Sequence, residues 1–458
     1  MEYTLEKLNK INHYRVIYLF IYFIALLVRS VNAYSLLPSK IDSLVFSVLA
    51  FIGVMFICSD FLLKIKNKET IEYNRLLIAF LLIFLLSSIV NMKYGLGSNL
   101  KLLAWNAILI FNVYEFSKQN VELTFFYSII ERILIVWLFL MSLISIVMYF
   151  IQFGFVRYGD GVLDRLRIGF LESRLFGVFG DPNYGAVMAL IAIIFSIYYL
   201  IEKKATTLVI QLFLIFSVLL QVAYIILSGS RAGLLTSYTV FFMAAFIFLM
   251  KNKKMGIKNI FLKVIVSIVV STIACAIIFF GVTAFKLLLE KLPVLLGTPK
   301  NISENRISLM RDDVQSNSDI SNMRFSIWKS AFETFKTTWL FGTSPRNLVA
   351  YATEVLPNTF IAQRKFVAHN TYLNILVSTG VLGALSMFTF FIQKAFYVVK
   401  ELFTNDDLNS SYFLPYTLAI ISLGISGFFV NEIILVNTVG AFIFWLCLGR
   451  LSGFLNKR

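Results

Sequence analysis

Charged side chains are scarce in this chain. Of its 458 residues, only 14% are Asp, Glu, Lys or Arg, whereas 59% are hydrophobic. A soluble domain usually carries about a quarter charged residues, so this chain could not cover a water-facing surface. Proline is also rare, with 7 residues, while phenylalanine is abundant, with 47, which excludes disordered, collagenous and low-complexity chains. The composition indicates a polytopic helical membrane protein.

Cysteine is nearly absent as well. Cys58, Cys275 and Cys447 each lie inside an apolar stretch, so we expect neither a disulfide framework nor a zinc site. The first apolar segment is too long for the hydrophobic region of a signal peptide, and we expect it to remain as a membrane helix. The net charge of +16 would indicate nucleic acid binding in a soluble protein. Here it is interpreted as the cations that orient membrane helices, with no nucleic-acid partner.

Apolar runs of about 20 residues, the length of a bilayer crossing, recur along the chain. We predict an all-α fold with about twelve transmembrane helices and a large, partly helical extracytoplasmic loop before the last three. Residues 1–285 would hold the first nine helices, 286–369 the loop and 370–458 the last three. The predicted spans are 15–34, 41–63, 76–92, 100–116, 124–153, 183–201, 206–227, 232–250, 264–285, 370–393, 413–430 and 432–449.

Lysines crowd the short loops on one side of the predicted bundle, for example Lys64, Lys66 and Lys68. By the positive-inside rule this side is the cytoplasm, and an even number of crossings places both termini there. The opposite side receives the segments 154–182 and 286–369 and a short tip at 228–230. The large loop contains a helix-like stretch, 322–339, whose aromatic residues recur at helical spacing. We expect this stripe to pack onto the membrane domain or the headgroup region.

Arginines gather on the predicted outer side. Orienting helices requires only charge, whereas arginine is preferred where phosphate or carboxylate must be held by two parallel hydrogen bonds. As a group they favour an extracytoplasmic anion site, although any single one can instead be solvated or contact lipid headgroups. The external arginines are Arg157, Arg165, Arg167, Arg174, Arg231, Arg306, Arg311, Arg324, Arg346 and Arg364.

Two residues stand out as candidates for chemistry. His369, one of only two histidines, lies where the outer loop meets a hydrophobic helix. Its side chain can accept a proton near neutral pH, and the alternative is a helix-capping or interfacial role. Arg231, in the polar break 228–233, is predicted at or below the outer membrane surface, where a charge is costly and therefore indicates function. Snorkelling to lipid headgroups is the alternative for Arg231.

Several well-known catalytic motifs are missing. The predicted outer side has no Asp-x-Asp pair to hold a divalent cation on a nucleotide, so we expect no metal site. The chain also has no phosphate-binding Walker loop and no Gly-x-Ser-x-Gly elbow, which gives ATP hydrolysis and serine-hydrolase chemistry no basis in the sequence.

Taken together, the remaining motifs resemble the O-antigen polymerase and ligase family of bacterial polysaccharide assembly. The resemblance covers most of residues 170–390 and agrees with the predicted topology. It rests on Arg-Leu-Phe-Gly…Pro-Asn at 174–183, Ser-Gly-Ser-Arg-Ala-Gly at 228–233, Arg324…Trp328…Phe341-Gly342, and His369-Asn370-Thr371-Tyr372-Leu373 followed by Gly380 and Gly383.

The resemblance implies a metal-independent, inverting glycosyltransferase that needs no cofactor. Its substrate would be a glycan linked to undecaprenyl pyrophosphate, used at the outer face of the bacterial cytoplasmic (inner) membrane. By this resemblance His369 would activate the acceptor hydroxyl, and Arg231 would stabilise the charge that develops on the pyrophosphate. The candidate substrate-binding residues are Arg174, Arg324, Asn183 and Asn370.

The family divides by acceptor, and the residues leave three functions open. We favour a polymerase of repeat units for O-antigen or capsule, for which a chain-length regulator protein is a candidate partner. The first alternative is an O-antigen ligase, which transfers polymer to the lipid A core. The second is a flippase or transporter of lipid-linked oligosaccharide, which would need charges along a path through both leaflets. A scaffold without catalysis would make His369 and Arg231 dispensable.

Overall fold

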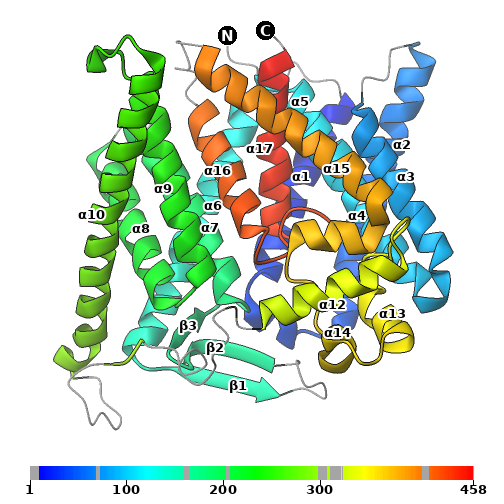
Figure 1. Cartoon of the computed structure of the whole chain (residues 1–458), viewed down its shortest axis with the longest axis horizontal. Coiled ribbons are helices and arrows are strands. Elements are labelled where there is room, and N and C mark those ends of the chain that lie inside the picture. Colours follow the sequence, from blue (N-terminus) through cyan, green and yellow to red (C-terminus); the bar gives the residue numbers. More distant parts are fainter. Residues whose placement is uncertain are drawn as a thin grey trace.

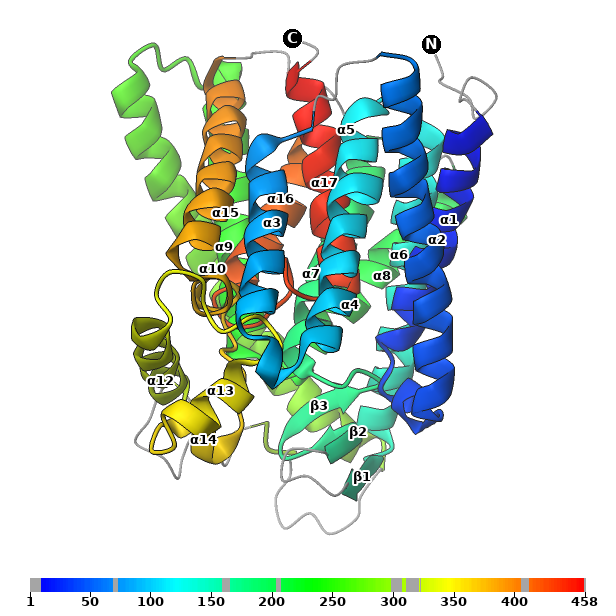
Figure 2. The ribbon, with the colours of Figure 1, turned by 90° about the vertical axis from the view of Figure 1, so that its right-hand side faces the viewer.

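The computed structural model describes residues 10–68, 73–158, 165–202, 207–297, 307–309, 321, 323–404 and 412–456. Long helices running side by side make up most of the molecule (Figure 1). The first helix begins and the last helix ends at the same end of this bundle, while a small sheet and three short helices lie at the other end (Figure 1, Figure 2). The predicted all-α, polytopic fold is confirmed.

The helices of the bundle follow one another along nearly the whole chain. They are α1 (Lys10–Arg29), α2 (Ser39–Lys66), α3 (Arg75–Val90), α4 (Leu96–Ala107), the π-helical η4 (Ile108–Glu115), α5 (Phe116–Gln119), α6 (Thr124–Phe150), α7 (Pro182–Ile201), α8 (Leu208–Leu227), α9 (Arg231–Lys251), α10 (Ile260–Leu295), α15 (Thr371–Thr404), α16 (Phe413–Ser426) and α17 (Val439–Asn456). The short helices are α12 (Arg324–Thr337), α13 (Leu348–Val355) and α14 (Phe360–Arg364).

Nine helices among the described residues are long and apolar enough to cross a membrane, with α4, η4 and α5 counted as one. Helices α3, α16 and α17 are apolar but shorter. Each predicted span overlaps one of these helices, because unbroken apolar runs of this length have few other ways to satisfy their backbone in lipid. The number of crossings remains a prediction.

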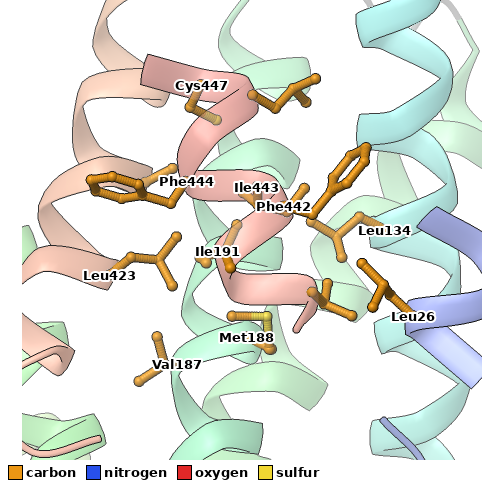
Figure 3. Close-up of a cluster of buried hydrophobic side chains, with 14 of the residues drawn as sticks. Leu26, Leu134, Val187, Met188, Ile191, Leu423, Phe442, Ile443, Phe444 and Cys447 are labelled. Carbon is orange, nitrogen blue, oxygen red and sulfur yellow. The ribbon is translucent and has the colours of Figure 1, made fainter. Parts of the chain in front are cut away.

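Helix α17 lies at the centre of the bundle and supplies much of its core (Figure 1). Two glycines allow it to approach η4 and α5 very closely. A Cβ atom at Gly449 would collide with the backbone oxygen of Tyr114, and one at Gly453 with that of Lys118. Its other side packs on α1, α6, α7 and α16 through Leu26, Leu134, Val187, Met188, Ile191, Leu423, Phe442, Ile443, Phe444 and Cys447 (Figure 3).

Helix α15 is broken at Gly380, which has φ 65° and ψ −170°. The outer segment 339–344 enters this break and satisfies the freed backbone groups. Thr343 N donates to Val377 O at 2.9 Å, and Val381 N donates to Trp339 O at 2.8 Å. Gly342, also with positive φ, has no room for a Cβ atom against the backbone of Ser378 and Thr379. The Phe-Gly and Gly380 motifs therefore anchor the loop predicted to be extracytoplasmic to α15.

A three-stranded antiparallel sheet occupies the predicted outer segment 154–182, where the sequence indicates only a loop. Its strands are β1 (Gly154–Tyr158), β2 (Arg165–Leu171) and β3 (Arg174–Gly177), in that order. Glu172 and Ser173, both with positive φ, form the turn between β2 and β3. A turn of this kind usually contains Asn or Gly, so the hairpin lacks the usual sequence signal.

The last two helices differ from their predicted spans. α16 ends at Ser426 and α17 begins only at Val439, so the residues predicted as 413–430 and 432–449 are separated by a longer non-helical segment, 427–438. Two side chains hold its backbone: Trp445 Nε1 donates to Ile433 O at 2.9 Å, and Leu435 N donates to Asn106 Oδ1 at 2.9 Å. Because neighbouring helices satisfy these groups, the chain can leave the helical state inside the bundle.

The aromatic stripe predicted between residues 322 and 339 lies on α12, and only part of it packs inward. Ile327 and Ala331 are buried, whereas Phe325 and Phe332 are 66% and 47% exposed. Trp328 and Phe335 are partly buried beside Ile327 and Ala331. Ile327 and Ala331, rather than the aromatic residues, are therefore the most deeply buried apolar residues of α12, whose neighbours are α14 and α15.

Candidate functional site

The polar break 228–233 forms the N-terminus of α9. Ser230 caps this helix, accepting a hydrogen bond from Gly233 N at 2.9 Å. Gly233 lies so close to Ala186 of α7 that a Cβ atom would collide with that side chain. The cap and the close approach hold Arg231, the first residue of α9, in the half-buried position next to α7.

Arg174, on β3, is tied to the same turn. Its Nε donates to the backbone oxygen of Ser228 at 3.0 Å, and its Nη2 lies 3.5 Å from Asn183 Oδ1. Asn183 Oδ1 also accepts a hydrogen bond from Ser230 Oγ at 2.8 Å. Three positions predicted from two motifs, Arg174, Asn183 and Arg231, thus lie around one turn.

His369 lies at the entrance to α15 in an unusual backbone conformation. Its φ is +46°, in the left-handed region that few residues other than glycine adopt. The next residue, Asn370, accepts hydrogen bonds from Tyr372 N and Leu373 N at 3.0 Å each, which caps α15. Asn370 Oδ1 therefore accepts hydrogen bonds from the first turn of α15. The predicted contact of Asn370 with substrate would be made by its side-chain NH₂ group.

The half-buried imidazole of His369 is influenced by charges from two other segments. Burial lowers its pKa below the ordinary value, Asp181 raises it, and Arg324 lowers it. Asp181 caps α7, accepting from Asn183 N at 2.8 Å, and Arg324 is the first residue of α12. The net lowering keeps the imidazole neutral, and therefore able to accept a proton, at neutral pH.

Asp181 connects the surroundings of His369 with the turn before α9. It acts on His369 on one side, and on the other side it begins the helix whose Asn183 binds Arg174 and Ser230. The sequence suggests capping for Asp181 and gives no sign of its neighbour His369, because the two lie far apart in the chain.

A pocket of about 530 Å³ lies beside this cluster. Asp181 lines it together with residues from the end of α1, the outer loop and the segment 427–438. The polar residues among them that are absent from the motifs are Arg29, Ser30, Tyr184, Arg346, Asn374, Asn431, Glu432, Asn437 and Thr438. Arg346 is one of the external arginines, whereas Arg306 and Arg311 fall outside the described residues.

Glu432 is the most unusual of these side chains. It is 8% exposed, and its Oε2 has no hydrogen-bond partner among the described residues. In a membrane protein, an acidic residue within an apolar run itself indicates function. Glu432 could therefore have been recognised as a candidate from the sequence alone.

A second buried charge, at Glu131, is fully enclosed. Glu131 lies 3.9 Å from Arg450 and accepts hydrogen bonds from Tyr199 at 2.8 Å and Tyr416 at 2.6 Å. The next residue in the chain, Arg132, is exposed. Glu131 and Arg450 therefore form a closed ion pair inside the bundle.

In the described part of the chain, no group of three or more His, Cys, Asp or Glu residues is arranged to hold a metal ion.

The fold and the site define a polytopic helical membrane protein with an arginine-lined polar site at one end of its bundle. Over residues 216–388, the chain matches the family model described as O-Antigen ligase. This match includes Arg231, Arg324 and His369, and it supports the predicted resemblance to the O-antigen polymerase and ligase family, which is a family of glycosyltransferase-like enzymes. No curated protein matches the chain.

Proposed function

We propose that the chain polymerises glycan repeat units carried on undecaprenyl pyrophosphate into O-antigen or capsular polysaccharide. The reaction takes place at the outer face of the bacterial cytoplasmic membrane, and both termini lie in the cytoplasm. One observation carries the proposal: a neutral, half-buried histidine shares its surroundings with Arg324 and with Asp181, whose helix also holds Arg174 and the turn before Arg231.

The chemistry follows from these positions. His369 takes the proton from the acceptor hydroxyl as its oxygen attacks the anomeric carbon of the donor sugar. The bond from that carbon to the pyrophosphate oxygen breaks in line with the attack, which inverts the configuration. Arg231 and Arg324 stabilise the negative charge that gathers on the departing lipid pyrophosphate. Arg174 and Asn183 hold Arg231 in place, and the amide of Asn370 contacts a sugar hydroxyl.

An apolar crevice supports a lipid-linked donor. It has a volume of about 380 Å³ and lies between Met243 of α9 and helices α15, α16 and α17. Tyr372 and Phe428 line it, and the next residue, Phe429, carries the guanidinium of Arg324 5.4 Å from its ring centre. A prenyl tail in this crevice would bring its pyrophosphate to Arg324.

A ligase is the second candidate, because the matching family model bears that description. The experiment that separates the two uses the purified protein in lipid nanodiscs with a defined undecaprenyl-pyrophosphate repeat unit, with and without lipid A core. A ladder of products from the repeat unit alone supports the polymerase. A product formed only when the core is present contradicts the polymerase and supports the ligase.

The enclosed pair of Glu131 and Arg450 gives a transporter no support, because both side chains are buried and paired with each other. Regulation of product length by a separate protein remains part of the proposal. Adding a chain-length regulator to the same reaction is expected to narrow the ladder without changing the rate of the first transfer.

A further inference from the structure

The pocket beside His369 contains more polar groups than the proposed transfer step uses. Of the residues that line it, Asp181 acts on His369, while Arg29, Arg346 and the segment 431–438 have no part in that step. A volume of about 530 Å³ is within the range of pockets that enclose small ligands. The charge and the hydrogen-bonding atoms of these groups indicate the chemistry of the ligand.

Two guanidinium groups face this pocket. Arg29 is held in a fixed position: its Nε and Nη2 each lie 3.1 Å from an oxygen of Asp42, and its guanidinium carbon lies 4.3 Å from the centre of the Phe46 ring. Arg346 lies near enough to Arg29 that its pKa is lowered, first by burial and then by the charge of Arg29. Two like charges brought together at a pocket favour an anionic ligand.

Arg346 is placed by its backbone rather than by an ion pair. Its N–H donates to Asn99 Oδ1 at 3.0 Å, and the next residue, Asn347, donates from Nδ2 to Asn91 O at 3.1 Å. Within the described segments, no carboxylate forms an ion pair with its guanidinium. Its charge is therefore available to a ligand.

The segment 431–438 adds three buried polar atoms without a hydrogen-bond partner among the described residues: Asn431 Oδ1, Glu432 Oε2 and Asn437 Nδ2. Tyr22 donates to Asn437 Oδ1, which fixes that side chain and leaves its NH₂ group for a ligand. Because buried polar groups are rarely left unpaired, these atoms indicate a partner that both donates and accepts hydrogen bonds. Sugar hydroxyls do both.

We propose that this pocket binds an acidic sugar of the acceptor glycan, with Arg29 and Arg346 on its anionic group and Asn431, Glu432 and Asn437 on its hydroxyls. This inference rests on the proposed function and names the substrate class of the same site. Arg346 lies within the matched residues 216–388, whereas Arg29, Asn431, Glu432 and Asn437 lie outside them.

The test measures binding, without turnover, to the whole protein in nanodiscs. The probes are a trisaccharide that ends in a hexuronic acid and the same trisaccharide with its carboxyl group reduced to an alcohol. We expect the native protein to bind the acidic probe more tightly, and Arg346→Gln to reduce this preference about tenfold to a hundredfold, as one charge-assisted hydrogen bond would. Asn437→Ala should weaken both probes equally.

The matched control is Arg364→Gln, which removes an exposed arginine of α14 and should leave both affinities unchanged. Equal binding of the two probes by the native protein, or an unchanged preference in Arg346→Gln, would overturn the inference. So would displacement of the acidic probe by geranyl pyrophosphate in the native protein, since the anion site would then belong to the donor. If the native protein forms polymer but binds the two trisaccharides equally, this inference is rejected and the proposed function stands. If it prefers the acidic trisaccharide but forms no polymer, the proposed function is rejected and the binding site stands.

Discussion

Arg174 donates a hydrogen bond from its Nε to the backbone oxygen of Ser228, 3.0 Å away. This contact joins the third strand of the outer sheet to the turn before α9, and a second contact, to Asn183, extends the link to α7. The residue that follows the turn is Arg231. The sheet, which the sequence does not predict, therefore holds Arg174 against the turn that precedes Arg231.

The geometry of the guanidinium group at position 231 should matter more than its charge. We expect Arg231→Lys to lower kcat by about tenfold to a hundredfold, because lysine keeps the charge but cannot make two parallel hydrogen bonds to phosphate. The rate of transfer by purified protein, normalised to folded protein, measures this. Arg364→Lys on the exposed surface of α14 is the control. Equal rates for native protein and Arg231→Lys would exclude a bidentate role.

The acidic limb of the pH–rate profile should report His369. A base must be unprotonated to act, so activity falls as the pH drops through the pKa of His369, which burial holds below its ordinary value. Asp181 raises that pKa, so Asp181→Asn should move the limb to lower pH while the asparagine still caps α7. Initial rates across the acidic range measure the shift. An acidic limb that stays in place in Asp181→Asn would contradict the assignment.

The break in α15 should depend on glycine. Gly380 combines positive φ with a backbone in contact with Leu340 and Phe341, so Gly380→Ala should lower the free energy of unfolding by about 2 kcal/mol or more. Gly281→Ala in α10 is the matched control, because no atom lies within 4 Å of the added Cβ, and it should not destabilise the protein. Thermal unfolding in detergent compares the two. Similar losses in both variants would show that the break is not a specific constraint.

The ion pair between Glu131 and Arg450 should serve stability rather than transport or catalysis. Glu131→Gln leaves a buried guanidinium without its anion, at a cost of about 3 kcal/mol or more in the free energy of unfolding. The folded fraction should still transfer sugar at the native rate. Glu202→Gln, at the exposed end of α7, is the control. A variant of Glu131 with native stability but no polymer would instead indicate a functional charge.

The sequence predicts the helices well because apolar length leaves a chain in lipid few alternatives. It predicts less where tertiary contacts replace the usual signals. The turn at Glu172 and Ser173 has no glycine, and the segment that contains Glu432 appears apolar enough to continue a helix. Among the candidate residues, the separate motifs are recognised, but their arrangement around Asp181 depends on how α7, α9, α12 and α15 are placed in the fold, which no local pattern encodes.

The most direct test of the central claim is the release of undecaprenyl pyrophosphate by the purified protein supplied with a defined repeat unit. The native protein should release one lipid pyrophosphate for each glycosidic bond formed, and His369→Ala, at normal folded levels, should release almost none. Release by His369→Ala at the native rate, or bond formation by the native protein without release, would contradict a histidine-assisted transfer from a lipid pyrophosphate.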